Sequence, residues 1–297
     1  MRNLWLFVSL LLAGTAVAAP ERKVISVGTR PESVTRGFGG RYFVTVMNDP
    51  KTPGDGVVKV IEGDAIGDFA TGFDEPKGIC FTGKFLVTTD VKRVWKIDEK
   101  GEKTILADEK DFLPTPVSFL NDTACEAGGK AVFVTDMGAN TKMRDDKGQL
   151  WPLDSDKAKE LPAIGRVYRI PLDGKPELAI DAGADLPCPN GVASPGKGRL
   201  LVAEFFKGNI LEKKGNKTVV LTSDYRGGDG IEQDRKGNIY LSSWTQGKLW
   251  KLDKHGKEQK LLAEGFQSAA DFFLDEKGKQ ILLPDTKAGT VTFVPLE

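Results

Sequence analysis

The chain has 297 residues, of which 40% are hydrophobic and 28% charged, and its 42 basic and 42 acidic side chains give a formal net charge of zero. This balance supplies no net field that would attract nucleic acid or an anionic membrane, so we expect neither partner. The length suffices for a large core, and all-β chains of this size often form a single domain.

The N-terminus is typical of an export signal. Arg2 precedes an apolar run from Leu4 to Leu12, and Ala16-Val17-Ala18 provides small residues for cleavage. A single spanning helix is the alternative, but the run is shorter than the roughly 20 apolar residues that a bilayer core requires. We therefore predict a signal peptide over 1–18 and a periplasmic or secreted mature domain over 19–297 that has no membrane span.

A four-strand unit recurs six times along the mature chain. The apolar segments at 42–47, 85–90, 132–136, 200–204, 239–243 and 281–285 each end in a polar turn. Alternating segments follow them at 57–60, 93–97, 166–170, 209–212, 248–252 and 290–294. Alternation indicates half-buried strands, and a period of about 40 to 50 residues is the signature of propeller blades. We predict an all-β, six-bladed β-propeller with four antiparallel strands per blade.

Two irregularities of the repeat carry information. The last unit lacks an outer strand, whereas Lys23 to Val27 has no unit of its own, so we expect this N-terminal strand to close the ring and remove open sheet edges. The third unit carries an insertion at about 138–165, between its second and third strands. It is either a lid over the central channel or a plain surface loop. The best helical candidate, Ser155 to Glu160, lies within it.

The chain contains three cysteines, which cannot all pair within one molecule. Cys80 and Cys125 lie in apolar, strand-like segments, and we predict them to be buried small hydrophobes rather than a disulfide scaffold. Cys188 lies between two prolines, where we expect a loop and either an inert or a reactive thiol.

Polar residues recur where the inner strands begin, and these positions converge on the axis of a propeller. In chain order they are Glu32, Lys77, Asn121, Asp122, Asn190, Asp229 and Asp271. Carboxylate and carboxamide oxygens suit Ca²⁺ or Mg²⁺ better than metals that prefer imidazole or thiolate. We expect Ca²⁺, with Mg²⁺ or Zn²⁺ as alternatives. The single histidine, His255, lies on a turn and supports neither a histidine-based zinc site nor a Ser-His-Asp triad.

Three motifs resemble the regucalcin/gluconolactonase family of six-bladed propellers, which includes luciferin-regenerating enzyme. They are Pro189-Asn190-Gly191, Gly228-Asp229-Gly230 and Asn121-Asp122, and the resemblance extends over essentially the whole mature chain. It implies that Glu32, Asn190 and Asp229 bind a divalent metal directly, with Asn121 as a fourth or water-bridged ligand.

The same resemblance implies hydrolysis of a lactone or related ester, in which the metal polarises the carbonyl group. Asp229 would then orient or deprotonate the attacking water, or serve as a metal ligand only. Asp122 either contacts substrate or holds Asn121 in place, and Asn140 and Lys77 are further substrate-binding candidates.

The chain departs from the sugar-lactone members at several positions. Phe119 replaces an arginine two residues before the Asn-Asp pair, Gly138 and Ala139 replace an acidic pair, and the segment around Glu32 is irregular. These changes favour a more apolar lactone or ester.

Two other functions are compatible with the sequence. A non-catalytic, exported propeller could bind a protein or glycan through its loop face, using aromatic residues expected to be exposed at the channel mouth. Those residues are Trp151, Phe205, Phe206 and Trp244. A metal could also serve only to stabilise the blades. In each case we expect a monomer.

Overall fold

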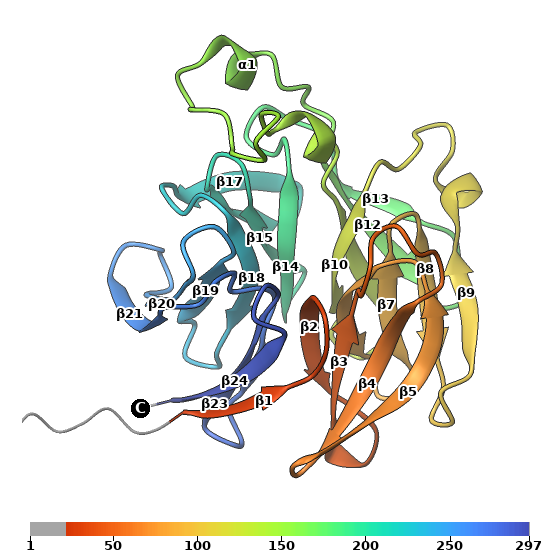
Figure 1. The fold of residues 1–297 in the computed structure, drawn as a ribbon. Helices are drawn as coiled ribbons and strands as arrows, with labels where there is room; N and C mark the ends of the chain where they lie inside the picture. Colours follow the sequence, from red (N-terminus) through yellow and green to blue (C-terminus); the bar gives the residue numbers. More distant parts are fainter. Residues whose placement is uncertain (1–21, 297) are drawn as a thin grey trace, which may run out of the picture.

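The computed structural model describes residues 22–296, which form six four-stranded antiparallel sheets arranged as the blades of a ring (Figure 1). The predicted six-bladed propeller is therefore confirmed. The predicted signal peptide, residues 1–18, lies outside the described residues. Within those residues, no helix is long and apolar enough to cross a bilayer.

The blades follow one another in chain order, with the first-named strand of each innermost. Blade 1 contains β2 (Pro31–Arg36), β3 (Tyr42–Val46), β4 (Gly56–Glu62) and β5 (Ala65–Phe73), and blade 2 contains β6 (Pro76–Phe81), β7 (Leu86–Asp90), β8 (Arg93–Ile97) and β9 (Lys103–Ala107). Blade 3 contains β10 (Leu120–Cys125), β11 (Ala131–Asp136), β12 (Arg166–Pro171) and β13 (Glu177–Ile180), and blade 4 contains β14 (Pro189–Gly196), β15 (Arg199–Glu204), β16 (Ile210–Lys214) and β17 (Lys217–Thr222). Blade 5 contains β18 (Gly228–Gln233), β19 (Ile239–Ser243), β20 (Lys248–Leu252) and β21 (Gln259–Glu264), and blade 6 contains β22 (Phe273–Asp275), β23 (Gln280–Asp285), β24 (Thr290–Pro295) and β1 (Lys23–Ser26).

The ring is closed by its two ends. β1 pairs antiparallel with β24, from Lys23 opposite Phe293 to Ser26 opposite Thr290, as the repeat predicts. The described helical elements are short: η1 (Phe38–Gly40), η2 (Glu109–Phe112), η3 (Asn140–Lys142) and α1 (Asp156–Lys159). The last two lie in the connection between β11 and β12, which projects from one face of the ring (Figure 1).

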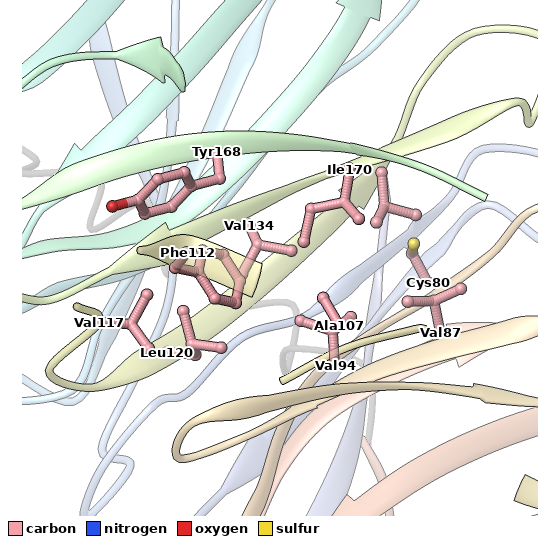
Figure 2. Packing of buried hydrophobic residues seen from close by; sticks show 11 residues of the cluster. Cys80, Val87, Val94, Ala107, Phe112, Val117, Leu120, Val134, Tyr168 and Ile170 are labelled. Atoms are coloured by element: carbon pink, nitrogen blue, oxygen red, sulfur yellow. The ribbon is translucent and has the colours of Figure 1, made fainter. Parts of the chain in front are cut away.

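The hydrophobic core is divided among the contacts between adjacent blades. Figure 2 shows the cluster between blades 2 and 3, where Val87 and Val94 lie against Val134 and Ile170. Because each sheet is apolar on both faces, packing against two neighbours buries most of its inner and second strands, whereas the outer strands stay largely exposed. The apolar side chains are thus used between the blades, and the axis is left to polar residues.

The inner strands share an irregularity that directs side chains to the axis. In five blades the pairing of the inner strand with the second strand shifts by one residue at the same place, as in a β-bulge. The shifts lie between Pro31 and Val34, Pro76 and Ile79, Leu120 and Thr123, Pro189 and Val192, and Gly228 and Ile231.

Hydroxyl groups of the second strands stabilise these bulges. Thr135 Oγ1 accepts a hydrogen bond from Asp122 N at 2.9 Å and donates one to Asn190 O of the next blade at 2.7 Å. Thr45 and Ser242 likewise accept from bulge amides of their own blades. A threonine or serine here therefore satisfies a backbone group that the bulge leaves unpaired.

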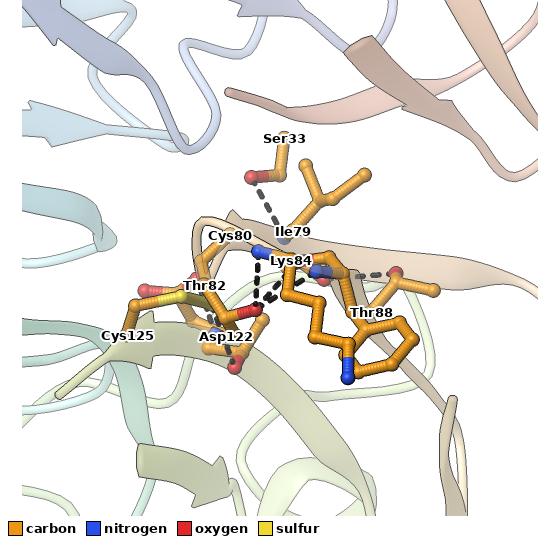
Figure 3. The surroundings of a disulfide bond; sticks show 11 residues. Ser33, Ile79, Cys80, Thr82, Lys84, Thr88, Asp122 and Cys125 are labelled. Atoms are coloured by element: carbon orange, nitrogen blue, oxygen red, sulfur yellow. Dashed lines mark hydrogen bonds between the residues drawn. A yellow bond between two sulfur atoms is a disulfide. The ribbon is translucent and has the colours of Figure 1, made fainter. Parts of the chain in front are cut away.

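Cysteine pairing differs from the prediction. Cys80 of β6 and Cys125 of β10 form a disulfide, with 5.8 Å between their Cα atoms, so the prediction of two unpaired hydrophobes was wrong (Figure 3). Their separation of 45 residues is about one blade, which brings both cysteines to similar positions on adjacent inner strands. Cys188 lies in the loop before β14, as expected, but it is fully buried, and burial raises the pKa of its thiol, which opposes reactivity.

The disulfide should contribute measurably to stability because it closes a long loop. Replacing Cys125 by Ala is expected to lower the free energy of unfolding by about 2–4 kcal/mol in urea titrations. Dithiothreitol should destabilise the parent protein by a similar amount and leave Cys125→Ala unaffected. Equal sensitivity of both proteins to the reductant would contradict the pairing.

Candidate active site

The second residue of each bulged inner strand points to one cavity on the axis. These residues are Glu32, Lys77, Asn121, Asn190 and Asp229, from blades 1 to 5. All five are buried and line a cavity of about 190 Å³. The sequence therefore identified side chains that the fold brings together, although nearly 200 residues separate the first from the last.

Four of these side chains present an oxygen without a hydrogen-bond partner. The unpartnered atoms are Glu32 Oε2, Asn121 Oδ1, Asn190 Oδ1 and Asp229 Oδ1. The amide nitrogens are already engaged: Asn190 Nδ2 donates to Asp229 Oδ2 at 3.0 Å, and Asn121 Nδ2 contacts Met137 Sδ at 2.8 Å. Buried oxygens without partners are rare in proteins, so these four are the groups available to a cation or a hydrogen-bond donor.

Burial also shifts the acidity of the two carboxyl groups. Burial first, and then the charge of Asp122, raise the pKa of Glu32 to about 8 against the opposing charge of Lys77. The pKa of Asp229 is raised well above its ordinary value by burial and then by the charges of Glu32 and Asp122. The protein alone therefore stabilises negative charge poorly here, and a bound cation would offset that cost.

Asp122, expected to contact substrate or to hold Asn121, lies one residue deeper in the channel. Its Oδ2 accepts a hydrogen bond from Val192 N at 2.7 Å, and its Oδ1 accepts one from Thr123 N at 2.6 Å. It is not among the described residues that line the cavity. Oδ2 thus connects blade 3 to blade 4 while Oδ1 is held within β10, which is the arrangement expected of a positioning residue. Asp271 lies in the same deeper layer and accepts a hydrogen bond from Ser33 Oγ.

Glycines follow three of the axial residues for a steric reason. A Cβ atom on Gly191 would overlap the carbonyl oxygen of Asp229, and one on Gly78 or Gly230 would overlap the neighbouring inner strand. The Asn-Gly and Asp-Gly pairs are thus sites of close strand approach within β14 and β18, although such pairs are more familiar in turns.

The connection between β11 and β12 forms one wall of the cavity. Asn140, Met143 and Arg144 line it, which favours the lid over the plain surface loop. The loop is anchored where Arg226 Nη2 donates to Trp151 O at 2.8 Å.

The aromatic residues near the mouth are less exposed than expected. Phe205 and Phe206 are buried under the lid, 4% and 1% exposed, so the prediction that they form an exposed surface was wrong. Phe205, Trp244 and Phe119 nevertheless line the cavity.

An adjoining groove connects the cavity to the surface. It has a volume of about 580 Å³ and shares Arg30, Trp244 and Thr286 with the cavity. Gly28 and Gly289 line its outer part, so it lies where blades 1 and 6 meet.

Comparison with protein families matches residues 72–263 to the SMP-30/Gluconolactonase/LRE-like region. The chain belongs to this family. The match contains four of the five axial residues, and the fold places the fifth, Glu32, in the same cavity. A comparison with curated proteins gave no match.

Solved structures with the same fold include gluconolactonase-type proteins. A gluconolactonase from Xanthomonas campestris is 18% identical, with a TM-score of 0.68, and the alignment covers 96% of this chain and 93% of that one. A structural-genomics target assigned provisionally as a gluconolactonase is 16% identical, with a TM-score of 0.64 and coverages of 94% and 95%. At these identities the likeness establishes the propeller fold alone.

Three residues that line the cavity of this SMP-30/gluconolactonase family member were not predicted from the sequence: Arg30, Met143 and Arg144. The first lies in a turn before β2, and the other two lie in the insertion, where no repeat indicates their position. Arg30 could have been recognised because it lies two residues before the axial residue Glu32. Nothing in the sequence of the insertion indicates that Arg144 reaches the cavity.

The close approach at Gly191 can be tested by adding one methyl group. Gly191→Ala is expected to lower the free energy of unfolding by about 1–3 kcal/mol, because the new Cβ has no space between β14 and β18. Gly183→Ala is the matched control, since nothing lies within 4 Å of a Cβ there. Thermal or urea unfolding measures the stability of both variants. Equal free energies of unfolding for Gly191→Ala and Gly183→Ala would contradict the close packing at Gly191.

Proposed function

We propose that the protein is a divalent-cation-dependent hydrolase of a lactone or related ester. Family membership supports the lactonase-type reaction class. The observation that carries the proposal is the set of four unpartnered oxygens, on Glu32, Asn121, Asn190 and Asp229, around one small cavity.

The donor set favours Ca²⁺ as the cation. It offers two carboxylates and two carboxamides, and hard oxygen ligands of this kind suit Ca²⁺ better than Zn²⁺. Nitrogen and sulfur ligands are scarce, because the one histidine, His255, lies on an exposed turn and Cys80 is paired with Cys125. Mg²⁺ is the nearest alternative.

A bound cation would supply Lewis-acid polarisation of the ester carbonyl. Asp229 is our candidate for orienting or deprotonating the attacking water as well as binding the cation, because its carboxylate lines the cavity and Asn190 Nδ2 holds its Oδ2 in place. Lys77 lies 4.5 Å from the centre of the Phe119 ring and close to Glu32, so its charge partly compensates the carboxylates. The lid and the aromatic wall would exclude bulk water from the reacting atoms.

Export remains part of the proposal. A disulfide between Cys80 and Cys125 is typical of proteins that fold in an oxidising compartment, and the apolar N-terminal run supplies a candidate signal.

The cation site should be visible in both stability and turnover. Ca²⁺ is expected to raise the melting temperature and to support hydrolysis of lactones or aryl esters, and a chelator should remove both effects. Asp229→Asn and Glu32→Gln should each lower kcat/KM by about 100-fold or more. Asp64→Asn, at an exposed carboxylate, is the matched control. If Ca²⁺ stabilises the protein but no lactone or ester is hydrolysed, the hydrolase proposal would be wrong and the cation would have a structural role only.

Cation affinity should rise with pH. The pKa of Glu32 in the cation-free protein is about 8, so below that pH the cation must displace a proton. Affinity is expected to increase by up to about tenfold per pH unit between pH 6 and 8 for each proton released, and then to level off. Calorimetry in two buffers of different ionisation enthalpy measures that release. A binding constant that does not change over this range would contradict the buried, protonated carboxyl.

A further inference from the structure

Three cationic side chains line the axial cavity, and two of them share one carboxylate. Arg30 Nη2 lies 2.6 Å from Glu75 Oε1, and Lys77 Nζ lies 3.7 Å from Glu75 Oε2. The third, Arg144, forms no ion pair with any carboxylate of the described residues. The lid therefore contributes a positive charge that the protein itself does not neutralise.

Arg144 is held firmly despite its lack of an ion pair. Its Nη1 donates to Gly148 O at 2.8 Å, and its guanidinium lies 5.3 Å from the ring centre of Phe205 and 5.6 Å from that of Trp244. A backbone bridge between Arg144 and Leu150 fixes the start of the lid. A guanidinium has five N–H groups, and only one hydrogen bond with the described residues, to Gly148 O, is formed here. The Arg144 guanidinium is therefore held in place with N–H groups left to bind a ligand.

Part of the cavity wall is apolar and offers few hydrogen bonds to a polyhydroxylated ligand, although Asn140 and Thr286 also line the cavity. Phe119, Met47, Met137, Met143 and Phe205 offer no strong hydrogen-bonding group. At about 190 Å³ the cavity is also smaller than the roughly 300–1,000 Å³ typical of ligand pockets, so a compact ligand is required. The combination of apolar walls and one unpaired guanidinium matches a compact apolar frame that bears an anion.

We infer that the substrate is a small lactone or ester that carries a carboxylate on an apolar frame, and that Arg144 is the residue that binds this carboxylate. Planar carboxylates match the guanidinium fork through two parallel hydrogen bonds. The inference rests on the proposed hydrolase function. Hydrolysis would add one water, break the acyl carbon–oxygen bond and release one proton; a lactone would give a hydroxy-dicarboxylate, and an open-chain ester would give a carboxylate and a separate alcohol.

Binding of an inert ligand tests the inference without any turnover. The probes are 2-furoate and its neutral analogue 2-furamide, titrated calorimetrically into the Ca²⁺-loaded protein. We expect 2-furoate to bind at least tenfold more tightly than 2-furamide, and Arg144→Gln to weaken 2-furoate binding at least tenfold. Equal binding of both probes, or unchanged 2-furoate binding by Arg144→Gln, would overturn the inference; the second result would place the carboxylate on the cation instead.

A second arginine separates recognition from lid anchoring. Arg226 holds the same lid through Trp151 O and Phe206 O but does not line the cavity. Arg226→Gln should therefore weaken 2-furoate binding much less than Arg144→Gln does. Equal losses in the two variants would reduce Arg144 to a structural part of the lid.

Turnover distinguishes this inference from the proposed reaction. We would compare 5-oxotetrahydrofuran-2-carboxylate with its carboxamide, expecting a kcat/KM ratio of at least ten that falls toward one in Arg144→Gln. Hydrolysis of both lactones at equal efficiency would overturn carboxylate recognition and leave the hydrolase intact. Binding of 2-furoate that depends on Arg144, without hydrolysis of either lactone, would support the carboxylate site and count against the hydrolase.

Discussion

The close approach of the inner strands to a single axis is the constraint on which the rest of the structure depends. Gly191 leaves no room for a Cβ against Asp229 O, so β14 and β18 nearly touch. At that spacing, polar side chains from successive blades must share one small volume away from water. Burial of polar groups costs little free energy only if they form hydrogen bonds with one another or bind a cation or ligand. In the deeper layer the polar groups satisfy one another, as Asp122 and Ser33 do through their hydrogen bonds. In the layer that lines the cavity, four side-chain oxygens have no hydrogen-bond partner.

The repeated blade made the architecture predictable. Alternating segments, the missing outer strand of the last unit and the surplus strand at Lys23 each follow from local sequence, and together they specify a closed ring of six. The axial residues were equally accessible, because once the blades are aligned Glu32, Asn190 and Asp229 occupy the same position. In a repeat protein, residues at equivalent positions of successive units lie close together, so long-range contacts can be predicted by aligning the units.

What escaped prediction lies where the repeat gives no guidance. Cys80 and Cys125 are offset by one position between blades 2 and 3, so alignment of the units does not superimpose them. Arg144 belongs to an insertion that no other blade contains, and its place above the cavity depends on packing over Phe205. Phe206 seemed exposed because its loop follows a strand end, but the lid covers it. In each case tertiary context, rather than local pattern, decided the outcome.

Ring closure by β1 and β24 affects the order in which the molecule can be assembled. Among the described strands β1 is synthesised first, but its partner β24 belongs to the last blade. Glu32 lies on β2 of blade 1, and this strand packs against β22 and β23 of blade 6 when the ring closes. A nascent chain that has formed blades 1 to 5 already contains the four open oxygens but lacks blade 6 and its cavity residue Thr286. The axial cavity therefore becomes complete in the same event that completes the ring.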